Sequence, residues 1–306
     1  MGQKMIISAI ICTHNRSDYL SRSINSLVHQ SYPASDYEIL VIDNHSSDDT
    51  KKIVTHGFQH VKNLRYIYEG AIGLSHARNT GWKEANGKYV AYLDDDAIVE
   101  KDWLEKIVSA FETIKPMPGC VGGKTEPIFE TPRPRWLTNT LLPYLSIINW
   151  SNTPIILSCG QWLIGTNMAF PKKLLADMNG FPLNLGRIGN KLLSGEERLL
   201  QLHLQAQGMT SYYDPRISVS HHIPISRLTR SWFVSRSFWS GVSKSVIIEN
   251  LSVCSKIPIK NLKGSSLIKP FRQRLGALKE LLSPFTVLCY LASLMGRISA
   301  QLKIVK

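Results

Sequence analysis

Apolar residues occur in short continuous runs along the first hundred positions, and each run is followed by a more polar segment. The runs occupy residues 5–13, 37–42, 64–69 and 88–93. After the first run, Leu20, Ile24 and Leu27 share one face of a predicted helix that Ser17 caps. Continuous apolar strands that alternate with helices are typical of a parallel sheet covered on both faces. The pattern therefore predicts an α/β fold whose ligands bind beyond the carboxyl ends of the strands.

The pattern beyond residue 100 is less regular. Asp102 is expected to cap a helix that runs to about Ile114. The stretch from Pro127 to Pro154 carries five prolines, which predicts a long irregular insertion of the kind that forms substrate walls or lids. Beyond it we expect a strand and three helices, over residues 155–164, 172–179, 194–208 and 226–249.

Length and composition fit one large globular core. The chain has 306 residues and is 43% hydrophobic, which excludes a disordered or fibrous protein. Its five scattered cysteines lack the CxxC spacing of redox and metal sites, so reduced thiols and a cytoplasmic location are expected. Charged and polar residues follow the first apolar run at once, without a small-residue cleavage site. We therefore interpret that run as a strand and not as a signal peptide.

Positive charge is concentrated towards the C-terminus. The net charge is +13, and the segment from His221 onward holds 14 of the 36 Lys and Arg residues but only two of the 23 acidic residues. Such a segment attracts nucleic acid or an anionic membrane surface. Nucleic acid is not expected as a partner, because the aromatic residues are not interleaved with the basic ones as in RNA-binding motifs.

The C-terminal tail, residues 251–306, pairs basic with apolar residues. Its longest apolar stretch, Phe285 to Met295, is too short for a transmembrane helix, which needs about 20 residues. Two alternatives stay open. The tail is either a basic amphipathic segment that lies in a membrane interface, or a helix that packs on the main domain and keeps its basic face in water.

Three consecutive carboxylates, Asp94, Asp95 and Asp96, end the fourth apolar run. Side chains alternate along a strand, so Asp94 and Asp96 are expected on one side and Asp95 on the other. Two carboxylates that converge in an open site suit Mg²⁺ or Mn²⁺, which takes diphosphate oxygens as further ligands. The alternative is a solvated acidic turn. A glycine cradle for phosphate is not expected, because Gly122-Gly-Lys-Thr125 matches only the end of a P-loop and Pro118 stands where its first glycine belongs.

Four motifs stand in order within the first hundred residues. They are Ile10-Ile-Cys-Thr-His-Asn-Arg16, Glu38-Ile-Leu-Val-Ile-Asp-Asn44, Gly73-Leu-Ser-His-Ala-Arg-Asn79 and Tyr92-Leu-Asp-Asp-Asp96. With Gly165-Thr-Asn-Met-Ala-Phe170 and Gly195-Glu-Glu197 added, residues 5–245 resemble the family 2 glycosyltransferases of the GT-A fold. Within that family the chain is similar to bacterial surface-polysaccharide members, including cyanobacterial hormogonium polysaccharide enzymes.

The resemblance implies a division of the chain. Residues 1–250 would form the GT-A domain, a mostly parallel sheet flanked by helices. Its donor half would end near residue 125 and its acceptor half would span about 126–250. Residues 251–306 would then be a helical, basic extension.

The resemblance also implies a nucleotide-sugar donor, with a UDP-sugar expected, and a divalent cation, Mn²⁺ or Mg²⁺. The last acid of the triple is the family's usual metal contact, so this role falls to Asp96, with Asp94 as the second metal ligand. Asp94 and Asp95 are also expected to contact the donor. His222 is a further candidate metal ligand, since imidazole is a common one, although paired histidines are more often structural.

Further donor contacts are implied at the ends of the other strands. Asp43 is expected to accept a hydrogen bond from the nucleobase, supported by Thr13 and Asn15, and Arg16 is a further expected donor contact; the alternative for Asp43 is a helix cap. Arg78 is expected to face base or phosphate in a bidentate way, and the alternative is a structural salt bridge.

On the acceptor side, Glu197 stands where the family's catalytic base is usually assigned. Glutamate in place of aspartate adds a methylene, so Glu196 stays in contention, and both acids are also favourable charges at a helix N-terminus. The turn Gly165-Thr166-Asn167 is expected near the acceptor. Trp162 either stacks on an acceptor sugar or lies in the core.

The function that the resemblance implies is an inverting single displacement, in which the sugar passes to a glycan or lipid-linked glycan in polysaccharide biosynthesis. The expected location is peripheral, at the inner face of the cell membrane. The alternative is a non-catalytic glycan- or nucleotide-binding relative. That alternative requires the loss of an essential acid, and Asp96, Glu196 and Glu197 are all present.

Overall fold

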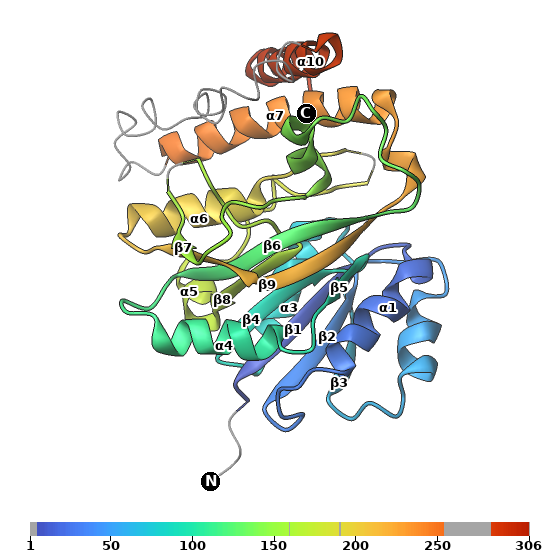
Figure 1. Cartoon of the computed structure of the whole chain (residues 1–306), viewed down its shortest axis with the longest axis vertical. Helices are drawn as coiled ribbons and strands as arrows, with labels where there is room; N and C mark the ends of the chain where they lie inside the picture. Colours follow the sequence, from blue (N-terminus) through green and yellow to red (C-terminus); the bar gives the residue numbers. More distant parts are fainter. Residues whose placement is uncertain (1–4, 159, 190, 254–282, 306) are drawn as a thin grey trace.

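The first four strands lie parallel and side by side, as the apolar runs predict. The computed structural model describes residues 5–158, 160–189, 191–253 and 283–305. One half of its sheet, in the order β3-β2-β1-β4 (Figure 1), consists of β1 (Ile7–Thr13), β2 (Tyr37–Asp43), β3 (Leu64–Tyr68) and β4 (Tyr89–Asp94). Parallel register brings Thr13, Asp43 and Asp94 to the same edge of the sheet. The predicted α/β fold is confirmed.

The other half of the sheet is mixed, which the apolar pattern did not predict. Its strands are β8 (Asn167–Pro171), β6 (Cys120–Phe129), β9 (Ser211–Ile223), β5 (Ala97–Val99) and β7 (Ile155–Ile156). β8 pairs antiparallel with both β4 and β6, β6 runs parallel to β9, and β5 and β7 pair antiparallel with β9. The predicted strand over residues 155–164 is therefore limited to its first two residues, and Pro127 lies in β6 and not in the irregular insertion.

Glycines explain why β6 escapes detection in the sequence. A methyl group on Gly122 would lie 2.3 Å from the carbonyl oxygen of Asn167, and one on Gly123 would lie 2.1 Å from that of Asp214. These contacts with the neighbouring strands β8 and β9 leave no room for a side chain, so β6 lacks the apolar run that marks the other central strands.

Helices cover both faces of the sheet. On one face, α1 (Ser17–Val28) and α4 (Trp103–Thr113) enclose a core with the side chains of Ile7, Ala9 and Ile11. The opposite face, which carries Ile10 and Ile42, is covered by α3 (Leu74–Glu84), α5 (Lys172–Asp177) and α6 (Glu196–Ala206). A short helix, α2 (Thr50–Lys52), continues into a π-helical turn, η1 (Ile53–Gly57).

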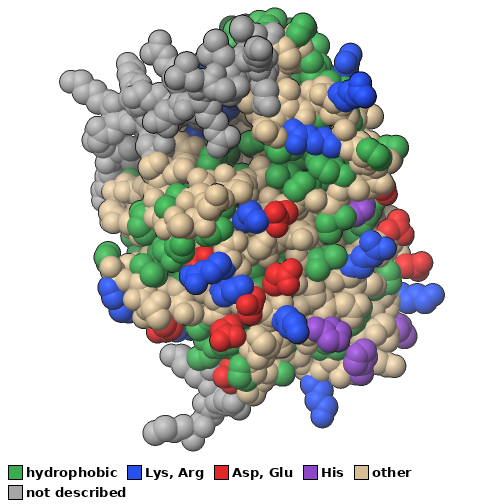
Figure 2. Space-filling view, viewed as in Figure 1, with side chains coloured by type: hydrophobic (Ala, Val, Ile, Leu, Met, Phe, Trp, Pro, Cys, Tyr) green, Lys and Arg blue, Asp and Glu red, His purple; other side chains and the backbone are tan. Residues whose placement is uncertain are grey.

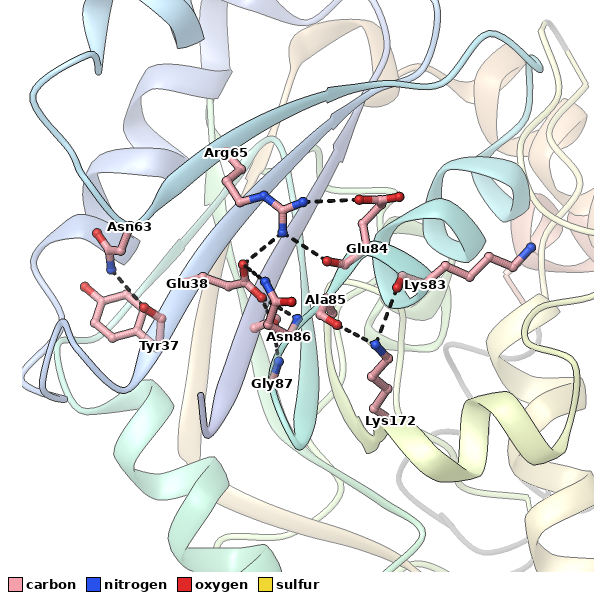
Figure 3. A network of polar contacts seen from close by, with 11 residues as sticks. Tyr37, Glu38, Asn63, Arg65, Lys83, Glu84, Ala85, Asn86, Gly87 and Lys172 are labelled. Carbon is pink, nitrogen blue, oxygen red and sulfur yellow. Dashed lines mark hydrogen bonds and ion pairs between the residues drawn. The ribbon is translucent and has the colours of Figure 1, made fainter. Parts of the chain in front are cut away.

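A polar network braces the amino-terminal edge of the parallel strands (Figure 3). The buried Glu38 carboxylate accepts hydrogen bonds from the Ser8 hydroxyl at 2.7 Å, the Asn86 backbone N–H at 2.6 Å and the Arg65 guanidinium at 3.1 Å. Burial alone would raise the pKa of Glu38, but these hydrogen bonds hold it below its usual value. The opposite, carboxyl-terminal edge stays available for chemistry.

The C-terminal part forms a layer beyond α6, at the end of the molecule opposite the N-terminus (Figure 1). It consists of the insertion after β6 with η2 (Asn139–Leu145), then η3 (Ile225–Arg227), α7 (Arg230–Val253) and α10 (Pro284–Gln301). Its own apolar core joins Leu141 and Leu145 of the insertion to Phe233 of α7 and Cys289 of α10.

The two long helices pack very closely at two glycines. A methyl group on Gly241 of α7 would lie 1.8 Å from the Ser293 carbonyl oxygen, and one on Gly296 of α10 would lie 2.0 Å from that of Phe238. The packed face of α10 carries small residues, which agrees with the alternative that the tail packs on the main domain. Of the predicted tail, residues 254–282 and residue 306 lie outside the described part. None of the described helices is long and apolar enough to cross a membrane.

Candidate functional site

The acidic triple forms the turn between β4 and β5. Asp94 is the last residue of β4, Asp95 and Asp96 form the turn, and Ala97 begins β5. Ala97 pairs with His221 of β9, which brings the imidazole beside the carboxylates. One ligand atom from each of Asp94, Asp96 and His221 lies within 4.8 Å of the other two. The predicted pairing of Asp94 with Asp96 is confirmed, although a turn produces it and not strand alternation.

The predicted histidine ligand is displaced by one residue. His221 Nε2 lies 3.0 Å from Asp96 Oδ1, whereas the ring of His222 packs at 4.8 Å from the ring of Tyr19, centre to centre. Adjacent side chains on β9 point to opposite sides, so only one of the two histidines faces the carboxylates. The assignment of His222 is thus corrected to His221.

The backbone of the insertion sets the tautomer of His221. Its Nδ1 lies 3.1 Å from the Leu145 carbonyl oxygen, which only accepts, so Nδ1 carries the proton and donates. Nε2 then points at the Asp96 carboxylate, and a proton or a cation between these two atoms makes the contact favourable. Two carboxylates and one imidazole are a donor set that fits a divalent metal ion.

Cationic groups surround the carboxylates. Arg16 forms an ion pair with Asp96, and an Arg227 guanidinium nitrogen lies 3.5 Å from Asp96 Oδ2. Burial alone would raise the pKa of Asp96, but His221, Arg227 and Arg16 hold it well below its ordinary value. Burial, followed by the charge of Asp96, raises the pKa of Asp95 to about 7.

A buried ion pair lies next to this group. Arg78 of α3 pairs with Glu196 at the start of α6, and its second terminal nitrogen lies 3.7 Å from Asp94 Oδ1. Gly165 makes room for this guanidinium, because a methyl group there would lie 2.0 Å from Arg78 Nη2. The ring centre of Phe181 lies 5.6 Å from the guanidinium carbon. Arg78 therefore links the acids of β4 to those of α6.

Glu197 differs from Glu196 in its surroundings. Both side chains are buried, and Oε2 of each has no hydrogen-bond partner among the described residues, but Oε1 of Glu196 is paired with Arg78. Burial, followed by the negative charge of Glu196, raises the pKa of Glu197 to about 8. A carboxylate with a raised pKa and a free oxygen is suited to accept a proton near neutral pH.

Comparison with known families identifies the chain. Residues 8–172, which include β1 to β8, match the family described as Glycosyl transferase family 2. The match covers more than half of the 306 residues. The chain belongs to glycosyltransferase family 2. It is accordingly a glycosyltransferase, as the four motifs implied, whereas the specific subtype stays a prediction.

Two archaeal proteins are similar to this family 2 glycosyltransferase over most of their length. The glucosyl-dolichyl phosphate glucuronosyltransferase of Haloferax volcanii is 26% identical over 79% of this chain and 77% of its own. The second is 25% identical over 79% of this chain and 74% of its own. It is the dolichyl N-acetyl-alpha-D-glucosaminyl phosphate 3-beta-D-2,3-diacetamido-2,3-dideoxy-beta-D-glucuronosyltransferase of Methanococcus voltae.

Solved structures share the fold. The mannosyltransferase PcManGT from Pyrobaculum calidifontis, in complex with GDP-Man and Mn²⁺, has a TM-score of 0.61 at 19% identity, covering 97% of this chain and 87% of that one. TarS from S. aureus, in complex with UDP, has a TM-score of 0.56 at 16% identity, with 98% and 92% covered. The expected GT-A fold is thereby confirmed.

Two of the predicted acceptor residues of this family 2 glycosyltransferase, Gly165 and Thr166, contact the charged side chains of the site. Thr166 donates a hydrogen bond of 2.5 Å to Asp94 Oδ2, and Gly165 accommodates Arg78. Asn167 is buried; its amide donates to the backbone carbonyl of Ile217 at 2.8 Å, and its oxygen accepts from Trp103 Nε1 at 3.0 Å. Both ends of this side chain are thus engaged within the fold, and it does not face an acceptor.

The fourth predicted acceptor residue, Trp162, is half-buried. The guanidinium of Arg198 lies 4.5 Å from its ring centre, and Trp150 Nε1 donates to its carbonyl oxygen at 2.9 Å. One face of this indole is therefore occupied by the protein itself, and its contact with a sugar stays a prediction.

The predicted nucleotide-binding residues lie in two interlocked loops after β1 and β2. The Asn15 backbone N–H donates to Ser46 Oγ at 2.9 Å, and Asn15 itself has a positive φ of 52°. Asp43 accepts from the Ser46 backbone N–H at 2.9 Å and from the Tyr66 hydroxyl at 2.7 Å. Asp43 thus braces its loop but does not cap α2, whose N-cap is Asp49, and Thr13 lies buried opposite Asp43 in β1. The contact of Asp43 with a nucleobase stays a prediction, and each of its carboxylate oxygens carries a second lone pair for it.

Three arginines of this enzyme's site were missed in the sequence. Arg227 of η3, Arg236 of α7 and Arg187 come from separate segments, and Arg236 is positioned by hydrogen bonds to Ser194 Oγ at 3.1 Å and the Leu192 carbonyl at 3.3 Å. Burial, followed by the positive charges of Arg236 and Arg227, lowers the pKa of Arg187 to about 9. Converging cations of this kind suit a polyanion. For Arg227 and Arg236 the sequence offered only a general basic excess after residue 220, and for Arg187 it offered no signal.

Proposed function

We propose that the enzyme transfers a sugar from a nucleotide-diphosphate sugar to a hydroxyl group of a glycan or lipid-linked glycan, with inversion at the anomeric carbon. The observation that carries the proposal is the juxtaposition of two acid pairs. Asp94 and Asp96 form a cation-binding pair with His221, and Arg78 connects Asp94 to Glu196 beside Glu197. A leaving-group site and a candidate base thus lie on either side of one arginine.

The donor half of the reaction needs stabilisation of a departing diphosphate. Asp94, Asp96 and His221 would hold Mn²⁺ or Mg²⁺, which supplies charge stabilisation to the leaving oxygens when bound. Arg227 lies within ion-pair distance of Asp96, and its neighbours Arg187 and Arg236 add positive charge. The solved structures of PcManGT with GDP-Man and of TarS with UDP support a nucleotide donor in this fold. A UDP-sugar stays our expectation, with Asp43, Thr13 and Asn15 towards the base.

For the acceptor half, we assign Glu197 as the general base that takes the acceptor proton. Its raised pKa keeps the proton on the carboxyl at the end of the reaction, and its free oxygen has room for one. Glu196 is less suited, because its carboxylate is already engaged in the buried ion pair with Arg78. A single base and a single displacement give inversion of configuration.

The acceptor and the location follow from two observations together. Both archaeal relatives are named for transfer to a dolichyl phosphate-linked sugar. The outer face of α10 carries exposed apolar side chains, among them Leu291, Met295 and Ile298. We therefore propose a lipid-linked acceptor in polysaccharide biosynthesis and a peripheral position on the inner face of the cell membrane, with α10 towards the lipid.

The test is titration calorimetry of the full chain with UDP-, GDP- and dTDP-sugars, with and without Mn²⁺. We expect metal-dependent binding of one donor, abolished in Asp96→Asn. Asp102→Asn is the matched control, because it removes an acid that pairs with Lys106 on the exposed side of α4. Failure of folded wild-type protein to bind any donor would favour the non-catalytic relative.

A further inference from the structure

A pocket lies in the C-terminal layer. It has a volume of about 530 Å³ and opens between the insertion, the start of α7 and the start of α10. Its apolar lining comes from Trp136, Val234, Pro284, Phe285 and Leu288. Nothing in the transfer reaction proposed above makes use of it.

Two arginines stand at this pocket. Arg135 and Arg230 both line it and both are exposed, and the guanidinium of Arg230 lies 5.6 Å from the ring centre of Phe285. Among the ion pairs of the described residues, neither arginine has a carboxylate partner. An apolar pocket lined by two exposed arginines is complementary to a hydrocarbon that carries an anionic group at one end.

The pocket is close to the transfer site along the chain. Arg230 follows Arg227 by three residues, so their Cα atoms are at most about 11 Å apart, and an Arg227 guanidinium nitrogen lies 3.5 Å from Asp96 Oδ2. The start of α7 at the pocket and the arginine beside the catalytic acids therefore belong to one short segment of the chain.

The apolar lining continues onto an exposed surface. Leu288 belongs to the pocket and to the outer face of α10, where the exposed apolar side chains follow one another at helical spacing: Val287, Leu288, Leu291, Leu294, Met295 and Ile298. The helix carries no Asp or Glu. Figure 2 shows apolar side chains gathered at this end of the molecule, with basic ones nearby. A hydrocarbon chain that leaves the pocket thus meets an apolar path and no opposing charge.

We infer that this pocket binds the phosphate and the first part of the hydrocarbon chain of a lipid phosphate that carries the acceptor sugar. The inference rests on the proposed function, and it names the part of the acceptor that this enzyme holds away from the reacting hydroxyl. Arg135 and Arg230 contact the phosphate, the aromatic lining contacts the chain, and the sugar extends past Arg227 towards Glu197.

The test uses farnesyl phosphate, a short lipid phosphate, in titration calorimetry with the full chain below its micelle concentration. We expect binding by the wild type and a loss of affinity of about tenfold or more in Arg135→Gln/Arg230→Gln, because each charged contact is worth about tenfold. Lys303→Gln, which removes an exposed charge at the far end of α10, is the matched control. Val234→Trp, which fills the pocket, should weaken binding without removing charge.

Comparison ligands decide the source of the phosphate. Farnesol and inorganic phosphate should each bind more weakly than farnesyl phosphate. Equal binding of inorganic phosphate, equal binding of lysophosphatidylglycerol, or unchanged affinity in the double variant would overturn the inference. The UDP-, GDP- and dTDP-sugar titrations on the same preparations separate this inference from the proposed transferase function. Metal-dependent donor binding without farnesyl phosphate binding would refute only the lipid phosphate site and leave the transferase function standing.

Discussion

Glu197→Gln separates catalysis from stability at the assigned base. The change keeps the size of the side chain and removes its ability to take a proton. With a pKa of about 8, about one tenth of the enzyme holds Glu197 ionised at pH 7 and about nine tenths at pH 9. The wild-type kcat/KM should therefore rise about tenfold between these pH values, whereas the variant should lose about 10²- to 10⁴-fold in kcat and show no rise.

The same pKa shift predicts that the variant stays folded. In the folded state the pKa of Glu197 lies above its ordinary value of 4.5, so the folded protein holds this proton more tightly than the unfolded chain. The contribution of Glu197 to the free energy of unfolding thus falls as pH rises from about 4.5 to about 8. Glutamine carries no such penalty, and Glu197→Gln should melt at pH 8 at the wild-type temperature or above it.

The neighbouring acid provides the control. Glu196→Gln leaves Arg78 buried without its main partner, which should lower the free energy of unfolding by on the order of 3 kcal/mol. The assay is initial-rate kinetics from pH 6 to 9.5 with calorimetric melting of the three proteins. Wild-type kcat in Glu197→Gln would remove this residue as the base, and a flat wild-type profile between pH 7 and 9 would contradict the raised pKa.

Three further predictions concern support of the fold and the site. Gly165→Ala places a methyl group 2.0 Å from Arg78 Nη2, so the free energy of unfolding should fall by about 1–3 kcal/mol. Donor affinity, measured by titration calorimetry, should fall as well, and intact donor affinity would contradict the prediction. Gly241→Ala should lower the melting temperature, because the added methyl group pushes α7 away from α10. Gly57→Ala is the control, since a methyl group there would have no neighbouring atom within 4 Å. Equal melting temperatures of the two variants would contradict the close contact of the helices. Glu38→Gln should cost about 1–3 kcal/mol at pH 7. Because the pKa of Glu38 is lowered in the folded state, the difference from wild type should vanish as pH falls below it, with kcat per folded molecule unchanged; a deficit that persists at low pH would refute this.

The sequence was sufficient wherever a local pattern determines position. The strands that the apolar runs predict end at Thr13, Asp43 and Asp94, and parallel register necessarily brings such ends to one edge. Glu196 and Glu197 were predicted at a helix start, which the structure has at Glu196. For these residues the prediction needed only strand periodicity and helix capping.

Prediction failed wherever a position depends on pairing between distant segments. His221 faces Asp96 because β9 pairs with β5 in one register, and a shift of one residue would have presented His222 instead. Asn167 is turned into the core by the pairing of β8 with β4 and β6. The meeting of Arg187, Arg227 and Arg236 depends on how three separate segments pack, and no spacing in the chain encodes it.

The hydrogen bond between Leu145 and His221 connects the insertion directly to the group formed by Asp94, Asp96 and His221. The same insertion supplies Trp136 to the pocket, and its Leu145 packs with Phe233 of α7. An occupant that moves the insertion moves the imidazole with it. Thermodynamic linkage then requires reciprocity, so an acceptor that tightens metal binding is itself held more tightly by the metal-loaded enzyme, by the same factor.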